Sequence, residues 1–502
     1  MRGTKGSERM KTGFNNDLYI RLQSKRIKDR IEQFHGKLYL EFGGKLFDDF
    51  HASRVLPGFA PDVKVRMLAE LKDEAEIVIA VSAAHIEANK RRADLGITYD
   101  ADVMRLIDAF RGIGLYIGSV VLTQYSGQRS ADAFALRLGE LGVKVYRHYP
   151  IPNYPADVEL VVSDEGYGKN DYIETTRQLV VVTAPGPGSG KMATCLSQLY
   201  HENKRGISAG YAKYETFPIW NLPLKHPVNI AYEAATADLD DVNMIDPFHL
   251  ETYGETAVNY NRDVEIFPVL KAILTRIYGT CPYNSPTDMG VNMAGYAIFD
   301  DEAVSAAAKE EIIRRAYKAR CQRANGLGSE NEVRKIDVLM KTVGVELESR
   351  RCVGPAHAVA ERTGAPAVAI ELPDGRIVTG KTSSLLGSAS AALINAMKVM
   401  ANIPDEHKII NTEIIEAVQK LKIGHMGAHN PRMHTDELLI ALSICSASDP
   451  VVAKAMLALD DLRGSEVHST VILASVDDGV FRKLGMNVTC DPVYQSKKLY
   501  HA

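Results

Sequence analysis

Short apolar runs alternate with amphipathic segments along the first 200 residues of the chain. The apolar runs have the length and β-branched content of buried strands and cover residues 37–42, 76–81, 115–122, 143–146, 158–162 and 179–182. Apolar residues at helical spacing lie between or before them, over residues 16–35, 61–72, 101–111 and 131–141. Strands that alternate with helices in this way predict right-handed β–α–β units. We therefore expect an α/β fold with a doubly wound, mostly parallel sheet.

The pattern changes after about residue 250, where helical periodicity dominates and predicts a mainly helical subdomain. A second α/β unit follows, in which a Pro-Asp-Gly turn and two apolar runs predict a hairpin. The expected elements are helices at 263–277 and within 301–346, hairpin strands at 367–371 and 376–379, an alanine-rich helix at 387–401, helices at 437–446, 450–459 and 481–484, and strands at 469–476 and 486–489. The predicted organisation is a tail (1–15), an N-terminal α/β domain (16–249), a helical subdomain (250–350) and a C-terminal α/β domain (351–502).

The composition narrows the class of protein without identifying it. The chain has 59 Lys and Arg against 63 Asp and Glu, a net charge of −4, so no basic field invites nucleic acid. No apolar run is long enough to span a bilayer, and the N-terminus lacks the apolar core of a signal peptide. The six cysteines are scattered, with no C-x-x-C pair, which argues against a zinc ribbon and a disulfide framework. We expect a soluble cytoplasmic protein.

The most informative stretch joins a predicted strand, LVVVT at residues 179–183, to a predicted helix through the turn APGPGSG. Gly186, Gly188 and Gly190 have no Cβ, so their amides can approach an anion closely. The following helix N-terminus adds unpaired amides and a positive dipole end, and Lys191 adds a full charge. The sequence therefore predicts a P-loop-like turn that binds phosphate.

This turn departs from the pattern G-x-x-x-x-G-K-[ST] at two positions. Pro185 stands at the first glycine position, and Met192 replaces the hydroxyl residue that holds Mg²⁺. Thr194 or Ser189 is the remaining source of a hydroxyl. The competing interpretation is a tight turn whose glycines serve geometry alone, and the preceding strand and the lysine favour phosphate binding.

A second stretch, GRIVTGKT at residues 375–382, fits the pattern fully. Its context is different, because Asp374-Gly375 is a typical hairpin turn and the residues after it are typical of an extended strand. No buried parallel strand precedes it. We expect a β-hairpin here and no phosphate site.

In an open parallel sheet, ligands bind outside the carboxyl ends of the strands. Polar, glycine-bearing segments follow the predicted strands at residues 42–45, 82–85, 123–129, 163–170 and 184–191. Two of them carry a lysine at or near the end, Lys45 and Lys169, and one ends in Arg129, which suits an anionic ligand. The residues assigned to ligand binding are Gly186, Gly188, Ser189, Gly190, Lys191, Thr194 and Lys45.

Two aspartates are candidates for positioning Mg²⁺ beside the phosphates. Asp246 ends the short apolar run VNMID downstream of the loop, and Asp164 follows the predicted strand VELVV. A carboxylate at a strand end is a common Mg²⁺ ligand. A helix cap or a turn explains each aspartate equally well.

Two metal hypotheses were weighed, and neither assigns a metal ligand. The hairpin followed by an alanine-rich helix resembles the cytidine deaminase fold, but Ser388-Ala389-Ser390 occupies the positions where a zinc deaminase needs His or Cys and Glu. The segment HMGAHNPRMHTDE holds the densest histidine cluster, at His425, His429 and His434. Its glycines and proline predict a loop, so we interpret it as a polar loop and not as a metal site.

Several long motifs connect the chain to a known group of proteins. They are KLYLEFGGKLFDDFHASRVLPGF, VVVTAPGPGSGKMATCLSQLYHE, IDPFHLETYG, NYNRDVEIFPVL, SPTDMGVNM and LPDGRIVTGKTS. On these motifs the chain, from about Gly13 onward, resembles a bacterial protein family filed as a domain of unknown function. The resemblance implies no established activity.

Two classes of function stay open. The first is a phosphotransferase- or ligase-type enzyme that binds ATP or another phosphorylated ligand, with Lys191 offsetting charge and Asp246 or Asp164 positioning Mg²⁺. Because Met192 removes the metal-binding hydroxyl, a phosphate ester or dinucleotide bound without Mg²⁺ also fits. The alternative is a non-catalytic metabolite-sensing protein. In either case we expect a phosphorylated small molecule as partner, no nucleic acid or membrane, and a homo-oligomer with the C-terminal unit as dimerisation module.

Overall fold

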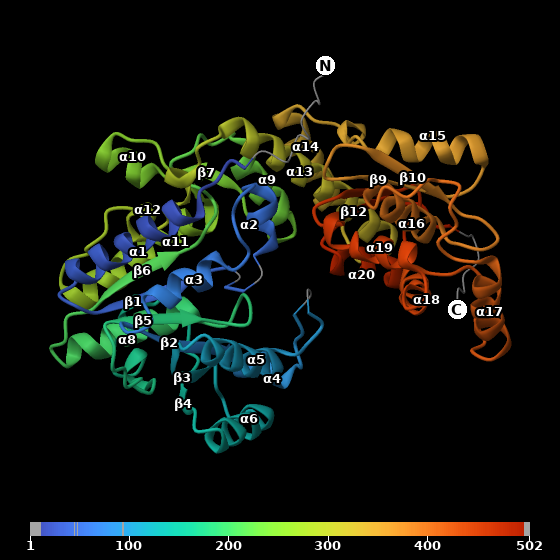
Figure 1. Cartoon of the computed structure of the whole chain (residues 1–502). Coiled ribbons are helices and arrows are strands. Elements are labelled where there is room, and N and C mark those ends of the chain that lie inside the picture. Colours follow the sequence, from blue (N-terminus) through green and yellow to red (C-terminus); the bar gives the residue numbers. More distant parts are fainter. Residues whose placement is uncertain (1–11, 45, 48, 93–94, 496–502) are drawn as a thin grey trace. The chain divides into compact units, whose positions relative to one another are not determined.

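The computed structural model describes residues 12–44, 46–47, 49–92 and 95–495, and all structural statements concern these residues. The chain divides into two compact units, which are Thr12–Ala307 and, for the described part of the remainder, Ala308–Ala502. Figure 1 shows the elements of both units. The boundary between them falls within helix α13 (Asp301–Ala324).

The N-terminal unit is built on a six-stranded sheet in the order β4-β3-β2-β5-β1-β6. Every neighbouring pair in it is parallel. The strands are β1 (Leu38–Phe42), β2 (Ala75–Ser82), β3 (Tyr116–Thr123), β4 (Lys144–Arg147), β5 (Leu179–Thr183) and β6 (Gly210–Tyr214). Strands β1, β2, β5 and β6 are buried along their whole length, which explains their near-continuous apolar sequences. The predicted α/β fold with a parallel sheet is confirmed.

Helices connect these strands as the alternation of patterns predicts. The helices of this part are α1 (Asn16–Gln33), α2 (Phe50–Val55), α3 (Val63–Glu70), α4 (Ala83–Glu87), α5 (Tyr99–Gly112), α6 (Arg129–Glu140), α7 (Val158–Val161) and α8 (Lys191–Lys204). Each strand of the first series, β2, β3 and β4, adds to one side of its predecessor, whereas β5 leads to β6 on the opposite side. The side of the sheet to which successive strands are added therefore changes between β2 and β5. In such a sheet, ligands bind outside the carboxyl ends of the strands at this point.

One predicted strand in this unit is wrong, and one observed strand was not predicted. Residues 158–162 form the short helix α7, whose first turn is capped by the Asp157 carboxylate at 3.1 Å from the Leu160 amide. A short run such as VELVV does not distinguish a strand from a helical turn, and the local cap decides. Conversely, no strand is predicted at β6 from the sequence, because its residues GYAKY include a lysine and no β-branched residue.

The rest of the N-terminal unit is mainly helical, with one small antiparallel sheet of β7 (Asn243–Ile245) and β8 (Val258–Tyr260). The helices are α9 (Pro227–Ala235), α10 (Pro247–Tyr253), α11 (Asn261–Tyr278) and α12 (Pro286–Met289), followed by the start of α13. Strand β7 therefore belongs to a different sheet from the glycine-rich turn. This matters for Asp246, the residue that follows it.

The C-terminal unit holds a four-stranded mixed sheet in the order β10-β9-β11-β12. The predicted hairpin is confirmed, because β9 and β10 pair antiparallel; β11 is antiparallel to β9 and parallel to β12. The strands are β9 (Ala367–Glu371), β10 (Ile377–Lys381), β11 (Glu466–Ser469) and β12 (Asn487–Cys490), and the helices are α14 (Glu330–Val343), α15 (Val353–Thr363), α16 (Ser388–Met400), α17 (Thr412–Gly424), α18 (Thr435–Ser446), α19 (Pro450–Leu457) and α20 (Ser475–Lys483).

The alanine-rich helix α16 packs its apolar face on this sheet, in a core that includes Ile370, Leu393, Met397 and Val467. The predicted strand at 469–476 is wrong, because β11 ends at Ser469 and α20 begins at Ser475. The Ser469 hydroxyl donates to the Val471 carbonyl at 2.7 Å and turns the chain out of the sheet. A serine side chain that bonds to nearby backbone competes with a strand in this way.

Candidate functional site

The glycine-rich turn connects β5, an inner strand of the parallel sheet, to α8. It therefore lies at the carboxyl end of that strand. Gly188 and Gly190 have φ angles of 75° and 80°, in the left-handed region that favours glycine. Gly190 is also the residue before the first turn of α8 and makes no side-chain cap there. The turn therefore delivers the chain into a fourteen-residue helix whose N-terminal amides carry no capping side chain.

The carbonyl groups of the turn are occupied by nearby hydroxyls. Ser189 donates to the Gly186 carbonyl at 2.9 Å, and Thr123, at the end of β3, donates to the Ser189 carbonyl at 2.9 Å. Thr194 donates both its amide and its hydroxyl to the Gly190 carbonyl, each at 2.9 Å. These bonds fix the turn by its acceptors. They also use the hydroxyls of Ser189 and Thr194, the two candidates for the missing Mg²⁺ ligand.

The amide groups of the turn are not occupied in the same way. Within the described part of the chain, the amides of Gly186, Gly188, Ser189 and Gly190 donate to no protein acceptor. The prolines between them have no amide, so they interrupt the row without adding a donor. A run of unpaired donors ahead of a helix N-terminus attracts an anion through both hydrogen bonds and the helix dipole.

Side chains from three neighbouring elements lie so close to the glycines that a Cβ would contact them. A Cβ on Gly186 would lie 2.3 Å from the Tyr99 hydroxyl, at the start of α5, and one on Gly190 would lie 3.1 Å from Thr123. A Cβ on Gly188 would lie 3.2 Å from His85, on α4. The segments that follow β2 and β3 therefore contact the turn that follows β5. This matches the expectation that loops from several strands meet at one edge of the sheet.

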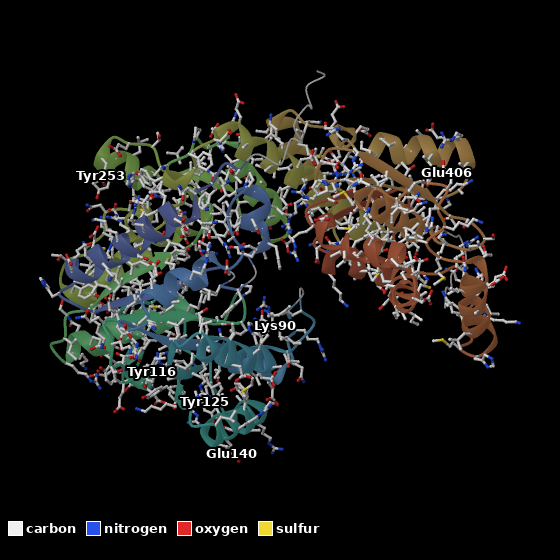
Figure 2. All side chains as sticks on the ribbon, in the orientation of Figure 1. Lys90, Tyr116, Tyr125, Glu140, Tyr253 and Glu406 are labelled. Carbon is white, nitrogen blue, oxygen red and sulfur yellow. The ribbon has the colours of Figure 1, made fainter. Side chains whose placement is uncertain are left out.

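A second cation stands near the turn. The Lys90 amine lies 3.3 Å from His85 Nε2 and 5.3 Å from the centre of the Tyr99 ring, and Figure 2 labels this exposed lysine. Burial, and secondarily the charge of Lys90, lower the pKa of His85. At neutral pH the imidazole is therefore uncharged, and it becomes an additional positive charge beside Gly188 only in acid.

Lys191 is half-buried at the first position of α8, and among the described residues it makes no hydrogen bond or ion pair. The effect of its charge is visible on Cys195, one turn further along the helix. Burial raises the pKa of this thiol, the Glu41 carboxylate raises it further, and Lys191 acts in the opposite direction. An amine without a carboxylate partner, at the N-terminus of a helix, is free to interact with an anionic ligand.

Beside the turn, the carboxyl ends of β1 and β6 carry a buried network that sequence reasoning missed. Lys213 on β6 donates to both oxygens of Asp263, at 2.7 and 2.5 Å, and to the Tyr260 hydroxyl at 2.6 Å. Tyr260 in turn donates to Glu215. Glu41, the register partner of Lys213 on β1, accepts the Tyr211 hydroxyl at 2.6 Å.

The network contains a carboxyl group with altered acidity. Burial raises the pKa of Glu215 against the opposing charge of Lys213, although a quarter of its side chain, 26%, is exposed. Burial opposes the charge of Lys213, but the carboxylates of Asp263 and Glu215 outweigh it and raise the pKa of the amine. A partly exposed carboxyl group with a raised pKa is a candidate general acid or base. The signal in the sequence was the pair of charges inside the apolar stretch GYAKYETF.

The structure gives Asp246 a structural role. Its side chain is fully buried, and one carboxylate oxygen accepts the amides of Phe248 and His249 at 3.0 and 3.1 Å, as the cap of α10. The other oxygen accepts the amide and hydroxyl of Thr287, at 3.1 and 2.6 Å. Four protein donors therefore use this carboxylate, which ends a strand of the small sheet and not of the parallel one.

Asp164 lies at the wrong end of α8 to meet a ligand at the turn. Its exposed carboxylate accepts the Tyr200 hydroxyl at 2.6 Å and pairs with Lys204, the last residue of the helix. Lys204 and Lys191 are thirteen residues apart on this helix, which places them about 20 Å from each other. The pairing with Lys204, before that with Tyr200, lowers the pKa of Asp164. The segment at 163–170 follows a helix, so it does not lie at a strand end.

The other predicted residues divide into those that the structure describes and one that it does not. Lys45 lies outside the described residues. His434 caps α18 and pairs with Asp477 at 2.9 Å, whereas His425 and His429 do not join it in a group of metal-binding geometry within the described chain. Residues 425–434 connect α17 to α18, and the prediction of a loop is confirmed.

Comparisons with known proteins agree with the resemblance noted in the sequence. Residues 12–344 match the family model "Domain of unknown function DUF1846, N-terminal", and residues 348–500 match its C-terminal counterpart. A UPF0371 protein of Streptococcus thermophilus is 59% identical over 490 residues, which cover 98% of this chain and 99% of the relative. A UPF0371 protein of Streptococcus pneumoniae is 58% identical over the same coverage. Among the described residues, no helix combines the length and apolarity that a membrane span needs.

Proposed function

The chain belongs to the DUF1846 family, and we propose that it binds the phosphate groups of a nucleotide or another phosphorylated small molecule at the turn of residues 186–191. The observation that carries the proposal is that the carbonyls of the turn accept hydrogen bonds from the protein, whereas its amides do not donate any to the described residues. Its carbonyls are held by Thr123, Ser189 and Thr194, while its amides face no protein acceptor within the described chain. Phosphate oxygens, which only accept hydrogen bonds, suit such a row of donors.

As an enzyme, the protein would be of the phosphotransferase or ligase type. The amides would hold the phosphates, Lys191 would offset the charge that develops on the transferring group, and Glu215 would accept or donate a proton at the neighbouring strand ends. The proposal assigns no role to Asp246 or Asp164, whose carboxylates are used elsewhere. Any Mg²⁺ would be held chiefly by the phosphates of a nucleotide such as ATP, since Met192 offers no oxygen ligand.

The alternative is a non-catalytic protein that senses a metabolite with the same turn. The hairpin β9–β10 followed by α16, the layout that resembles the cytidine deaminase fold, would then serve for assembly and not for zinc chemistry. Ile440 and Ile444, one turn apart on α18, are 63% and 72% exposed and would suit a contact with a second copy. The proposed homo-oligomer predicts that Ile440→Asp with Ile444→Asp lowers the mass measured by light scattering.

One titration separates the two functions. The melting temperature of the purified full-length protein would be followed with ATP, with and without Mg²⁺, and ADP release would then be measured. Stabilisation with turnover that Lys191→Ala abolishes supports the enzyme, and stabilisation without turnover supports the sensor. The matched control is Lys381→Ala, in the hairpin that contains the same motif. No stabilisation by ATP, ADP, dinucleotides or inorganic phosphate would contradict phosphate binding itself.

We also propose a cytoplasmic location, with which the six free cysteines agree.

A further inference from the structure

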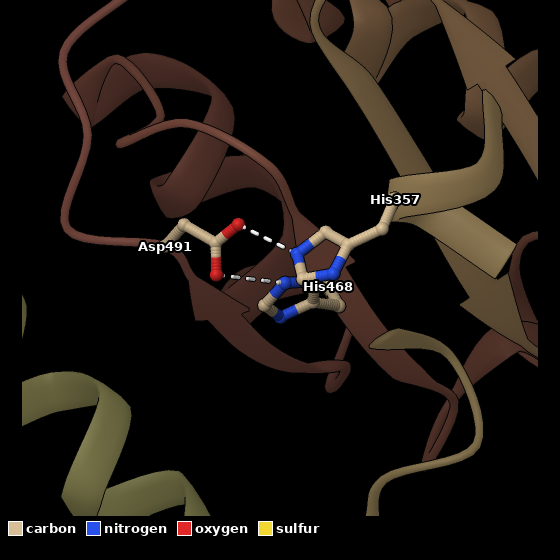
Figure 3. Close-up of side chains that lie close together, drawn as sticks. All are labelled: His357, His468 and Asp491. Carbon is tan, nitrogen blue, oxygen red and sulfur yellow. Dashed lines mark hydrogen bonds and ion pairs between the residues drawn. The ribbon is translucent and has the colours of Figure 1, made fainter. Parts of the chain in front are cut away.

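Three side chains that are far apart in the sequence converge in the C-terminal unit. His357 comes from α15, His468 from β11, and Asp491 from the residue after β12. Figure 3 shows the two imidazoles against the two oxygens of the one carboxylate. One nitrogen or oxygen atom of each residue lies within 4.8 Å of the others, and no other such group of three occurs within the described residues. None of the three belongs to the histidine-rich loop or to the start of the alanine-rich helix, the two segments considered as metal sites in the sequence.

The contacts of Thr489 indicate which nitrogen of His468 carries the proton. The Thr489 hydroxyl donates its one hydrogen to the Val467 carbonyl at 3.0 Å, so its oxygen is an acceptor towards His468 Nδ1, which lies 3.0 Å away. Nδ1 therefore bears the hydrogen of the neutral ring. The opposite nitrogen, Nε2, presents a lone pair.

That lone pair is buried and faces a negative group. The His468 side chain is 0% exposed, and its Nε2 has no hydrogen-bond partner within the described chain. Asp491 Oδ1 lies across from it at 3.4 Å, the contact drawn as a dashed line in Figure 3. Two acceptors that face each other in a buried place repel one another unless a positive charge lies between them.

Nearby cations do not supply that charge. The guanidinium of Arg350 pairs with Glu466 at 3.0 Å and donates to the carbonyls of Val467 and Asn487 at 3.3 and 3.4 Å. His357 Nε2 lies 2.7 Å from Oδ2, the other oxygen of Asp491, so its contact is with Oδ2 and not with Oδ1. The space between His468 Nε2 and Asp491 Oδ1 thus lacks a protein donor among the described residues.

We propose that His357, His468 and Asp491 form a binding site for a divalent transition-metal ion of the Zn²⁺ class, with Thr489 positioning His468. Two imidazoles and one carboxylate are a common set of protein ligands for a metal that keeps a further position open. His357 and Asp491 are 39% and 20% exposed, which leaves solvent access to that position. The Thr489–His468 bond is the outer-shell contact that orients a metal-binding imidazole.

The fit requires one small movement. Metal–ligand distances of about 2.0–2.2 Å in a tetrahedron separate the ligand atoms by about 3.4 Å. The separation of His468 Nε2 from Asp491 Oδ1, 3.4 Å, already has this value. His357 Nε2 lies 2.7 Å from the other oxygen, Oδ2, and must move away from it to share a metal with the other two residues. His357 is the most exposed of the three and lies on a helix at the surface, so its side chain can rotate to provide the difference.

The test is metal binding by the full-length protein after chelation and dialysis. We expect one equivalent of Co²⁺ to give the visible absorption of a four- or five-coordinate site and to be displaced by Zn²⁺. His357→Ala, at the exposed position, and Asp491→Asn should each weaken Zn²⁺ binding by more than about tenfold, and Thr489→Val by about tenfold or more. Circular dichroism and melting curves check that the variants fold.

The matched control is His434→Gln, which disrupts another histidine–aspartate pair of the same unit and should leave Zn²⁺ affinity unchanged. Less than one equivalent of bound Co²⁺ or Zn²⁺ at saturating metal would overturn the proposal. So would binding that survives both His357→Ala and Asp491→Asn, or an NMR spectrum of the chelated protein at neutral pH in which His468 Nε2 already carries a proton. This proposal does not rest on phosphate binding at the turn.

Discussion

The stretches at residues 184–191 and 375–382 both carry the glycines and the lysine of a phosphate-binding pattern, and the fold uses their backbone amides differently. In the hairpin, the Gly375 amide donates to the Leu372 carbonyl at 2.8 Å, and the next residues join the antiparallel ladder of β9 and β10. At Gly380 a Cβ would lie 2.1 Å from the Ala392 amide nitrogen, so this glycine allows α16 to pack on the strand. In the hairpin, backbone groups therefore form the hydrogen bonds of the turn and of the ladder, and Gly380 allows close packing against α16.

In the turn after β5, side-chain hydroxyls hold the carbonyls and leave the amides without protein acceptors in the described chain. The motif letters are a better match in the hairpin, yet the donors an anion needs are present in the turn. The difference teaches that a phosphate motif is a statement about backbone amides. Its letters matter only where the flanking strand and helix leave those amides unpaired.

The largest expected effect separates the two lysines. Lys191→Ala removes a charge-assisted contact of about 1.5–3 kcal/mol and should weaken nucleotide affinity about ten- to a hundredfold. Lys381→Ala removes an exposed charge on β10 and should leave affinity unchanged. Isothermal titration of both variants measures the contrast. Equal losses in the two variants would break the comparison.

The second effect separates two left-handed glycines, one from each stretch. Gly190 and Gly375 have φ angles of 80° and 82°, so an alanine at either costs about 1–2 kcal/mol of stability. Only Gly190→Ala also brings a Cβ to 3.1 Å from Thr123 and disturbs the row of amides. Urea unfolding should show losses in both variants, with the larger one for Gly190→Ala. Ligand binding should fall in that variant alone, and an unaltered affinity would mean that the turn does not hold the ligand.

The third effect concerns the two aspartates proposed from the sequence. Asp246→Ala removes a buried cap that accepts from four donors, and it should lower the free energy of unfolding by about 1–3 kcal/mol. Asp164→Ala removes a surface pair and should change stability by less than about 0.5 kcal/mol. Neither substitution should alter nucleotide affinity in protein that remains folded. A selective loss of Mg²⁺-dependent binding in either variant would restore that aspartate to the site.

These outcomes show how far the sequence carries. The strands at β1 to β5 and the hairpin follow from local apolar patterns, and so does the turn, because its strand, glycines and lysine are contiguous. Helix α7 and the end of β11 were missed, since a side-chain cap and a serine turn decide them locally.

The Lys213 network and the His357–His468–Asp491 group were not predictable from one chain of letters. Their members come from helices and strands that are far apart in the sequence, and only the tertiary fold brings them together. Asp246 and Asp164 illustrate the reverse error. Each follows a short apolar run, but one run is a strand of the small sheet and the other is a helix.

The smallest expected effect is a pH dependence of stability and of anion binding at the turn, which arises from His85. The hairpin at residues 375–382 should not contribute to it. The pKa of His85 is lowered in the fold, so this residue favours the folded state least in acid: stability is unaffected above the ordinary pKa near 6.5 and falls as the pH drops through the folded pKa. Protonated His85 adds a positive charge beside Gly188, so sulfate, whose own charge is constant here, should bind about twofold tighter in acid. His85→Gln should remove this gain. A gain that persists in that variant would assign it to another group.

The most direct measurement follows the amides themselves. Protein labelled with ¹⁵N-glycine would be titrated with ATP and with inorganic phosphate, and the glycine resonances assigned by single Gly→Ala variants. We predict saturable downfield proton shifts for Gly186, Gly188 and Gly190, with Gly375 and Gly380 unmoved. Resonances of the turn that stay in place at saturating ligand, or shifts confined to other glycines, would contradict the account.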